Sequence, residues 1–317
     1  MRIGFLSLLA LSASAIMSFV IIPPQQALRD VSLYINPESQ LVKWVRDNPS
    51  DGRIATISRI TSIPQAIWLS GSESDQEGLA KVISDSSSQD KVPILVLYNI
   101  PNRDCGSYSA GGAANAEVYK EWTKMVANTI GMNRAIIIIE PDALPDIECL
   151  SESQKEERFE LIKNSAVTLS QNPNAYIYLD AGHAQWISAR EMADRLERAG
   201  VEHVQGFSLN ISNFLTNDEN IKYGRTISKQ FFDKKTFIID TSRNGNGPAD
   251  NNEWCNPAGR KLGTTPTTTP DTAYVDALLW IKPAGESDGT CNGGPNAGEF
   301  WPQYAYELVL NTVKTNP

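Results

Sequence analysis

The sequence predicts an α/β fold built on a parallel β-sheet, and three observations support this. Short runs rich in Ile, Val and Leu alternate with amphipathic segments along most of the chain. The runs are apolar throughout, as expected for strands that are buried on both faces of a parallel sheet. Acidic residues follow most of the runs, where a parallel sheet presents its ligand-binding edge. These patterns leave open whether the sheet closes into a barrel or stays open and doubly wound.

The expected elements can be placed in chain order. Between the strands, residues 117–130 and 189–199 carry apolar side chains at helical spacing, and Gly200 provides a stop signal. Residues 264–270 (TTPTTTP) are interpreted as a surface loop rather than a linker, because a further strand and a cysteine follow them. The expected strands cover residues 65–69, 94–100, 135–139, 175–179, 204–209, 236–239 and 277–281.

A single domain is expected over residues 28–317. The chain of 317 residues has 41% hydrophobic and 21% charged residues, which is an ordinary globular composition. Its start is different, because one Arg is followed by an apolar stretch over residues 3–22 and then by two prolines. This pattern is typical of a secretory signal, here over residues 1–27, and implies an extracellular protein. The alternative is an uncleaved anchor, since about 20 apolar residues can just span a bilayer.

Charge and histidine content exclude two classes of partner. The formal net charge of −9 disfavours nucleic acid, because an acidic surface repels phosphate groups. The two histidines are His183 and His203, and neither lies in a cluster with the spacing of zinc ligands. We therefore expect no metal and no cofactor.

The four cysteines are Cys105, Cys149, Cys255 and Cys291. In an exported protein an even number without a CxxC motif indicates two disulfides rather than a metal site, although buried free thiols are the alternative. Three pairings are compatible with the sequence. Pairing of neighbours closes two loops of about 40 residues, each worth about 3–4 kcal/mol in the chain-entropy model.

Carboxylates follow five of the expected strands. A single Asp at such a position is more often a helix cap or a turn residue, but five in succession indicate a shared function. Converging carboxylates without a nucleophilic Ser or Cys motif favour glycoside hydrolysis, in which one carboxylic acid donates a proton. Crowding of the acids raises one pKa, so that this proton is kept near neutral pH. The residues are Asp104, Glu140 with Asp142, Asp180, Asp240, and Glu286 with Asp288.

Aromatic residues near these acids offer flat apolar faces for sugar rings. Trp68, Trp186, Trp254 and Trp280 are candidates, and packing in the core is the alternative for each of them. Trp122 and Trp301 fall on helical patterns and are assigned to the core. The sequence Asn210-Ile-Ser212 fits a glycosylation sequon but lies at a strand end inside the presumed site, so it receives little weight.

The motifs together resemble those of glycoside hydrolase family 6, the inverting cellulases, from about Trp68 to Trp301. The combination is far more specific than any single motif. The resemblance implies a distorted barrel of about seven parallel strands that hydrolyses β-1,4-glucosidic bonds with inversion at the C-terminal strand ends. The matching stretches are YNIPNRDC (98–105), IEPD (139–142), YLDAGHAQW (178–186), residues 240–247, WCN (254–256) and WIKPAGESDG (280–289).

The resemblance also implies a role for each matching residue. Asp142 corresponds to the general acid, and Asp104 raises the pKa of Asp142 and organises the attacking water. Asp288 corresponds to the residue argued to be the base, and Tyr98 to the tyrosine that distorts the substrate ring. The family's two disulfides agree with the pairing of neighbouring cysteines. Substrate contacts carry over to Trp68, Ser70 (an Asp in fungal exo-acting members), His183, Trp186, Asn213, Trp254, Lys282 and Glu286, with Arg103 and Asp180 in support.

Loop lengths bear on the mode of attack. Exo-acting members cover the active site with long insertions, whereas here only residues 289–298 separate Asp288 from Glu299. We therefore expect a secreted, monomeric endoglucanase that acts on cellulose, cello-oligosaccharides or related β-glucans and has no separate carbohydrate-binding module. The alternatives are a cellobiohydrolase of the same family and a catalytically silent glucan-binding protein, against which the presence of Asp142 argues.

Overall fold

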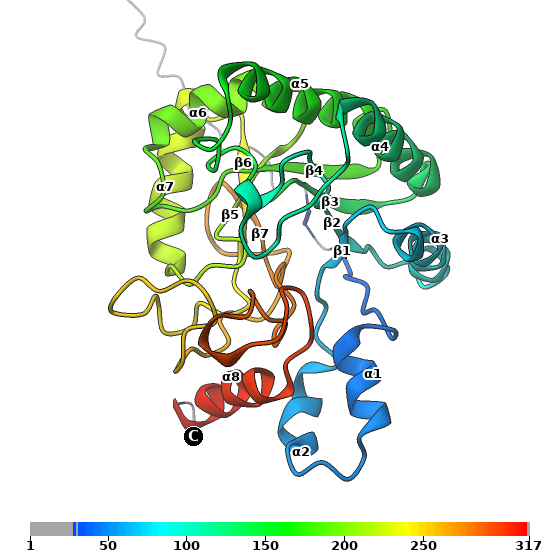
Figure 1. The fold of residues 1–317 in the computed structure, drawn as a ribbon, viewed down its shortest axis with the longest axis vertical. Coiled ribbons are helices and arrows are strands. Elements are labelled where there is room, and N and C mark those ends of the chain that lie inside the picture. Colours follow the sequence, from blue (N-terminus) through cyan, green and yellow to red (C-terminus); the bar gives the residue numbers. More distant parts are fainter. Residues whose placement is uncertain (1–27, 30, 316–317) are drawn as a thin grey trace, which may run out of the picture.

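The computed structural model describes residues 28–29 and 31–315 (Figure 1). The expected secretory signal over residues 1–27 lies outside these residues. Within the described part of the chain, none of the helices combines the length and the apolarity that a bilayer span requires.

Among the described residues, seven parallel strands form one sheet in which the spatial order follows the chain. The sheet curls until its edges approach each other: the N–H of Ala66 donates to the carbonyl of Trp280 at 3.0 Å, and the indole N–H of Trp68 donates to that of Ile281 at 2.9 Å. The predicted α/β fold with a distorted parallel barrel is confirmed. The strands are β1 (Ile67–Leu69), β2 (Ile94–Leu97), β3 (Ala135–Ile139), β4 (Ala175–Asp180), β5 (Gly206–Leu209), β6 (Thr236–Asp240) and β7 (Val275–Leu279).

Helices connect the strands from β1 to β6 and surround the sheet in an arc (Figure 1). Three of them begin with capping boxes at Ser72, Ser151 and Thr216, whose side chains satisfy free backbone N–H groups. Gly200 adopts φ 82 after the helix over residues 189–198, as its stop signal predicts. These helices are α3 (Glu73–Ser88), α4 (Ala116–Ile130), α5 (Glu152–Leu169), α6 (Ala189–Arg198) and α7 (Asn217–Gln230).

The remaining helices lie together at the other side of the sheet in Figure 1. They are α1 (Gln40–Asp47), α2 (Ile54–Ile57) and α8 (Pro302–Thr315), while the short 3₁₀ helices are η1 (Ser58–Ile60), η2 (Asp104–Gly106), η3 (Val201–His203) and η4 (Cys291–Gly293). Leu41, Ile57 and Leu308 join them in one apolar cluster. The N-terminal segment thereby packs against the C-terminal helix.

The strands are apolar throughout because both of their faces are buried. In β3, Ile137 and Ile139 pack in the cluster between sheet and helices, whereas Ile136 and Ile138 pack in the cluster inside the barrel. This alternation follows from the two-residue period of a strand. The sequence pattern is thus explained by a sheet with a core on each side.

Two disulfides confirm the pairing of neighbouring cysteines. Cys105 is bonded to Cys149, and Cys255 is bonded to Cys291. The first joins η2 to the loop after β3, so it fixes two strand-end loops relative to each other.

The interpretation of residues 264–270 as a surface loop is wrong in part. Thr267 exchanges two backbone hydrogen bonds with Leu278 of β7, and Thr268 is only 7% exposed.

Candidate active site

A cavity of about 540 Å³ lies at the C-terminal ends of the strands. Among the described residues, most of the predicted site residues meet there, although they come from all seven strands or the segments that follow them. Its walls combine carboxylates with aromatic rings, as sugar-binding sites do. The predicted residues that line it are Trp68, Tyr98, Asp104, Asp142, His183, Trp186, Asn213, Trp254, Lys282 and Asp288.

Asp142 is the carboxyl best placed to hold a proton. Its backbone has φ 69, in the left-handed region, and its N–H donates to Oδ2 of Asp180 at 2.9 Å. This turn buries Glu140, which accepts hydrogen bonds from the N–H groups of Asn99 and Ile100. Burial raises the pKa of Asp142 well above its usual range, and the negative charges of Asp180, Asp104 and Asp146 raise it further.

Asp104 and Tyr98 are held by the loop that follows β2. The N–H of Ser109 donates to Oδ2 of Asp104 at 2.6 Å, while burial raises the pKa of Asp104. The Tyr98 ring meets the Trp68 ring edge-on at 5.1 Å between centroids. The guanidinium of Arg103 lies 4.7 Å from the Tyr98 ring, and Nη1 of Arg103 donates to the backbone carbonyl of Tyr98 at 2.5 Å. Arg103 thus supports the position of Tyr98.

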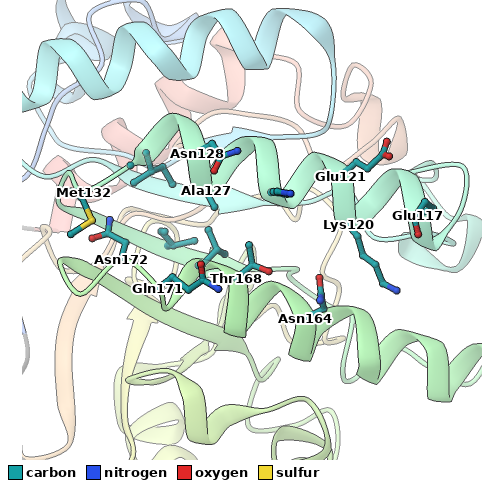
Figure 2. A pocket seen from close by; sticks show the side chains of 16 residues that line it. Glu117, Lys120, Glu121, Ala127, Asn128, Met132, Asn164, Thr168, Gln171 and Asn172 are labelled. Carbon is teal, nitrogen blue, oxygen red and sulfur yellow. The ribbon is translucent and has the colours of Figure 1, made fainter.

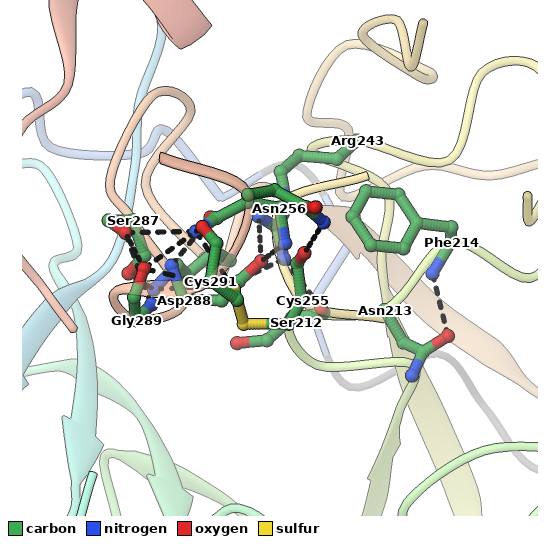
Figure 3. Close-up of polar contacts among 12 residues, drawn as sticks. Ser212, Asn213, Phe214, Arg243, Cys255, Asn256, Ser287, Asp288, Gly289 and Cys291 are labelled. Carbon is green, nitrogen blue, oxygen red and sulfur yellow. Dashed lines mark hydrogen bonds and ion pairs between the residues drawn. A yellow bond between two sulfur atoms is a disulfide. The ribbon is translucent and has the colours of Figure 1, made fainter. Parts of the chain in front are cut away.

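Asp288 is held by cations and by backbone donors. Its two oxygens accept hydrogen bonds from Nη1 and Nη2 of Arg243 at 2.9 and 3.0 Å (Figure 3). Lys282 Nζ lies 3.6 Å from Oδ1. The N–H of Asn256 also donates to Oδ2, at 3.0 Å. Bidentate pairing with a buried guanidinium stabilises the ionised carboxylate and fixes its orientation. Arg243, Lys282 and the N–H of Asn256 therefore hold the carboxyl group of Asp288 in one orientation.

Exposed rings and free polar atoms complete the cavity. Trp186 is 39% and Trp254 is 48% exposed, so part of each indole ring is accessible in the cavity. Burial lowers the pKa of His183 to about 4, which keeps the imidazole neutral, and its Nδ1 accepts from the N–H of Gln185. Asn213 turns Oδ1 toward the N–H of Phe214, which leaves its amide N–H groups for substrate (Figure 3).

Ser70 and Glu286 line a second cavity of about 850 Å³ that adjoins the first. The two cavities share Trp68, Tyr98 and Lys282 in their walls. The hydroxyl of Ser70 donates to Asp75 at 3.0 Å, and burial raises the pKa of Glu286 to about 7. Both residues therefore belong to the same continuous surface, at one end of the catalytic cavity.

The expectation that acids from five strands converge is wrong for two of them. Asp240 is buried and accepts hydrogen bonds from backbone N–H groups, among them those of Ser212 and Lys282. Asp180 likewise accepts from the N–H groups of Asp142 and Gly182, and neither Asp180 nor Asp240 lines the cavity. These carboxylates hold the strand-end loops, and Asp180 supports Asp142 in this way.

Burial decides three further expectations. Trp280 is 1% exposed and its indole N–H donates to the carbonyl of Thr264, so it is a core residue and not a sugar-stacking ring. Trp122 is buried, as expected. Asn210 is fully buried, and its amide donates to the carbonyl of Asp240. It is therefore no acceptor for a glycan.

Three residues of the site were missed by the sequence analysis. Asp146 lines the catalytic cavity one turn after Asp142, and its acidity was the only available signal. Arg243 lies in a loop after β6 and pairs with Asp288 across 45 residues. Gln40 begins α1 and donates to Oε1 of Glu286 at 3.1 Å, a contact across 246 residues that no local pattern indicates.

A third cavity of about 730 Å³ lies between α4 and α5 and holds none of the predicted site residues (Figure 2). Its rim carries Lys120 and Glu121 from α4 and Asn164 and Thr168 from α5. Within the described part of the chain, no group of three or more His, Cys, Asp or Glu side chains is arranged to hold a metal ion.

Comparison with known proteins places the chain in a family. Residues 28–312 match the glycosyl hydrolases family 6. The chain belongs to this family. It is 42% identical to Endoglucanase 1 of Streptomyces halstedii over 96% of this chain and 97% of that protein. It is 28% identical to a 1,4-beta-D-glucan cellobiohydrolase of Podospora anserina over 81% of this chain and 70% of that protein.

A solved family 6 structure has the same fold. The structure of the endoglucanase Cel6 from Mycobacterium tuberculosis, in complex with methyl-cellobiosyl-4-deoxy-4-thio-β-D-cellobioside, is 43% identical and superimposes with a TM-score of 0.85. The match covers 91% of this chain and all of that one. The resemblance stated from the motifs is thereby confirmed at the level of family and fold.

Proposed function

We propose that this family 6 glycoside hydrolase is an endo-β-1,4-glucanase that cleaves cellulose or related β-glucans with inversion. The observation that carries the proposal is Asp142, a carboxyl with a strongly raised pKa in a cavity walled by exposed tryptophans. Relatives with similar coverage and about 40% identity are named endoglucanases, and one is bound to a thio-linked cello-oligosaccharide. Cellobiohydrolases among the relatives are less similar.

Asp142 acts as the general acid in this proposal. The reaction breaks the bond between the anomeric carbon and the leaving glucosyl oxygen, and that oxygen takes the proton of Asp142. Burial and the neighbouring carboxylates keep Asp142 protonated, because both raise its pKa. Tyr98 lies against the sugar ring that carries the anomeric carbon. The contacts of Tyr98 with Trp68 and Arg103 allow the tyrosine little movement. It therefore enforces a distorted ring shape.

A water molecule attacks the anomeric carbon from the opposite face and loses its proton. Asp104 or Asp288 accepts it, directly or through further water. The paired geometry of Asp288 favours the route through Asp104, because both oxygens of Asp288 are already occupied by Arg243. Among the described residues, the N–H of Ser109 is the only hydrogen-bond donor to the carboxylate of Asp104. Asp288 then holds the side chains of Arg243 and Lys282 in place beside the reacting sugar.

The short loop after Asp288 favours attack within a chain over attack at its end. Gly298 donates to the carbonyl of Ser287, and Ser287 donates to that of Glu299, so the loop closes on itself. Cys291 anchors it to Cys255. Among the described residues, none of residues 289–298 lines the cavity around Asp142. A cellobiohydrolase is the alternative within the family, and it requires a covered site.

The mode of attack can be tested on soluble carboxymethyl cellulose. An endoglucanase lowers the viscosity strongly while few reducing ends are released, whereas an exo-acting enzyme releases reducing sugar with little loss of viscosity. The second result would overturn the endo assignment. A protein without any hydrolysis that still binds the glucan would be the silent binding protein instead.

We also propose an extracellular, monomeric protein in which residues 28–317 form one catalytic domain after a signal over residues 1–27. The two disulfides support this location, because such bonds persist in oxidising compartments. The match to the family begins at residue 28, which agrees with the proposed domain boundary. N-terminal sequencing of the exported protein tests the boundary, and light scattering tests the oligomeric state.

A further inference from the structure

The second cavity extends well beyond the residues predicted to bind substrate. It begins at Trp68, Tyr98 and Lys282, which it shares with the catalytic cavity. From there it continues between helix α3 and the N-terminal segment 34–43. We call this outer part the distal groove. It is lined by Ser74, Gly78, Lys81 and Asp85 of α3 and by Asn36, Glu38, Gln40 and Lys43 of the N-terminal segment.

The distal groove has an apolar floor and a polar rim. Tyr34, Leu79 and Val82 form buried parts of its lining. On the rim, Lys81 pairs with Asp85 at 2.6 Å and Lys43 pairs with Glu38 at 3.8 Å. A pyranose ring presents apolar C–H faces and a rim of hydroxyl groups, so it is complementary to such a surface.

The N-terminal wall of the groove is fixed to the rest of the protein. The N–H of Tyr34 donates to the carbonyl of Val92, and the N–H of Val92 donates to that of Ser32. At the inner end, Gln40 donates from Nε2 to Glu286 and to the carbonyl of Gly298, while its Oε1 accepts from the N–H of Phe300. The groove therefore exists without a ligand, and its wall directly orients Glu286.

We infer that the distal groove binds the continuation of the β-1,4-glucan chain, beyond the glucosyl units held at Trp68, Lys282 and Glu286. This inference rests on the proposed function and extends it from a site to a length of substrate. The helix from Ser74 to Asp85 measures about 16 Å at 1.5 Å per residue, which is longer than one pyranose ring. The occupant is thus more than one additional glucosyl unit, and long chains are preferred over short ones.

Gly78 allows the groove to be blocked without disturbing the core. It lies within α3 and is exposed, and a Cβ at this position meets no atom within 4 Å. Gly78→Trp therefore places a large ring in the groove, and replacement of a glycine inside a helix improves helix propensity. Gly52 is also exposed with no atom within 4 Å of a Cβ, but it lines none of the described cavities. Gly52→Trp is the matched control.

The measurement is kcat/KM on cellotetraose and on cellohexaose for the unsubstituted protein and both variants. We expect the unsubstituted protein to prefer cellohexaose, and Gly78→Trp to reduce that preference on the order of tenfold while cellotetraose is cleaved as before. Gly52→Trp should change neither rate. A rise confined to cellohexaose in Gly78→Trp would also locate the chain in the groove, because the new ring can stack on a sugar.

Two results overturn the inference. In the first, the unsubstituted protein cleaves both oligosaccharides with equal kcat/KM. In the second, Gly78→Trp changes both rates equally or neither. Failure of the proposed function looks different, since the unsubstituted protein would then hydrolyse no β-1,4-glucan of any length.

Discussion

The backbone N–H of Asp146 donates a hydrogen bond to the carbonyl of Asp142 at 2.9 Å, and both side chains line the catalytic cavity. Two acids one turn apart thus face the same space. Because like charges disfavour a second ionisation, the carboxylate of Asp146 raises the pKa of Asp142. Asp146 thereby helps to keep the proton on Asp142.

The first prediction concerns this neighbour. In Asp146→Asn the pKa of Asp142 falls, because one of the negative charges that raise it is removed. The acid must be protonated to act, so the alkaline limb of the pH–rate profile moves to lower pH. Profiles of kcat/KM on cellohexaose measure this shift. Asp194→Asn, an exposed substitution on α6 outside the cavity, is the control and should leave the profile unchanged.

The second prediction concerns Asp142 itself. Asp142→Ala should lose about 10²–10⁴-fold in rate on unactivated glucan, the usual contribution of a positioned acid. Aryl glucosides with very acidic leaving groups need little protonation and should lose much less. Steady-state rates on both types of substrate decide the matter, and equal losses would remove Asp142 from this role.

The third prediction concerns stereochemistry. Direct attack by water, as proposed, makes the α-anomer the first product from a β-linked glucan. Retention requires a carboxylate nucleophile about 5–5.5 Å from the acid and a covalent intermediate. Proton NMR in the first minutes of the reaction distinguishes the anomers before mutarotation mixes them. A first product with β configuration would contradict the proposed mechanism.

The fourth prediction concerns the pair Arg243–Asp288. Each partner is nearly fully buried, with 0% and 4% of the side chain exposed. Asp288→Asn should lower the free energy of unfolding by about 3–5 kcal/mol, because it leaves the buried Arg243 without its carboxylate partner. Arg243→Leu should lower it less, because Lys282 remains 3.6 Å from Asp288. The double variant should lose less than the sum of the two. Urea denaturation of all four proteins gives the coupling, and strictly additive losses would show that the pair contributes no interaction energy.

The fifth prediction concerns stability and pH. Burial raises the pKa of Glu140 to about 7, above the value of 4.5 for an ordinary Glu. The folded protein therefore holds a proton that the unfolded chain releases, so this contribution is complete below about pH 4.5 and is lost as the pH rises to about 7. The melting temperature should fall over this interval, by about 2–4 °C for each kcal/mol lost. Calorimetry between pH 4.5 and 8 measures it, and a rising melting temperature would contradict the expectation.

The sequence by itself determined the elements of the fold and the composition of the site. Runs such as residues 135–139 are apolar at every position because each face of the strand has its own core, so burial on both sides is visible locally. The capping residues and Gly200 mark helix ends through contacts within a few residues. The catalytic motifs are contiguous stretches, so their resemblance to family 6 needed no structure.

Only the tertiary structure decided which of these residues face the substrate. The left-handed turn at Asp142 directs one acid into the cavity, while Asp180 and Asp240, the last residues of β4 and β6, bind backbone N–H groups instead. The direction of a side chain at a strand end depends on the local φ and on donors from neighbouring loops. For the same reason Trp280 became a core residue.

Long-range partners were also beyond the sequence. Gln40 reaches Glu286 across 246 residues, and Arg243 reaches Asp288 across 45. No periodicity or motif links such pairs. Arg243 and Asp288 meet because β6 and β7 are neighbours in the sheet, and Gln40 meets Glu286 because the N-terminal segment lies beside the loop after β7. Contacts between residues close in the sequence therefore specified the helices, strands and motifs of this protein. The packing of the strands and of the N-terminal segment decided which side chains contact one another in the site.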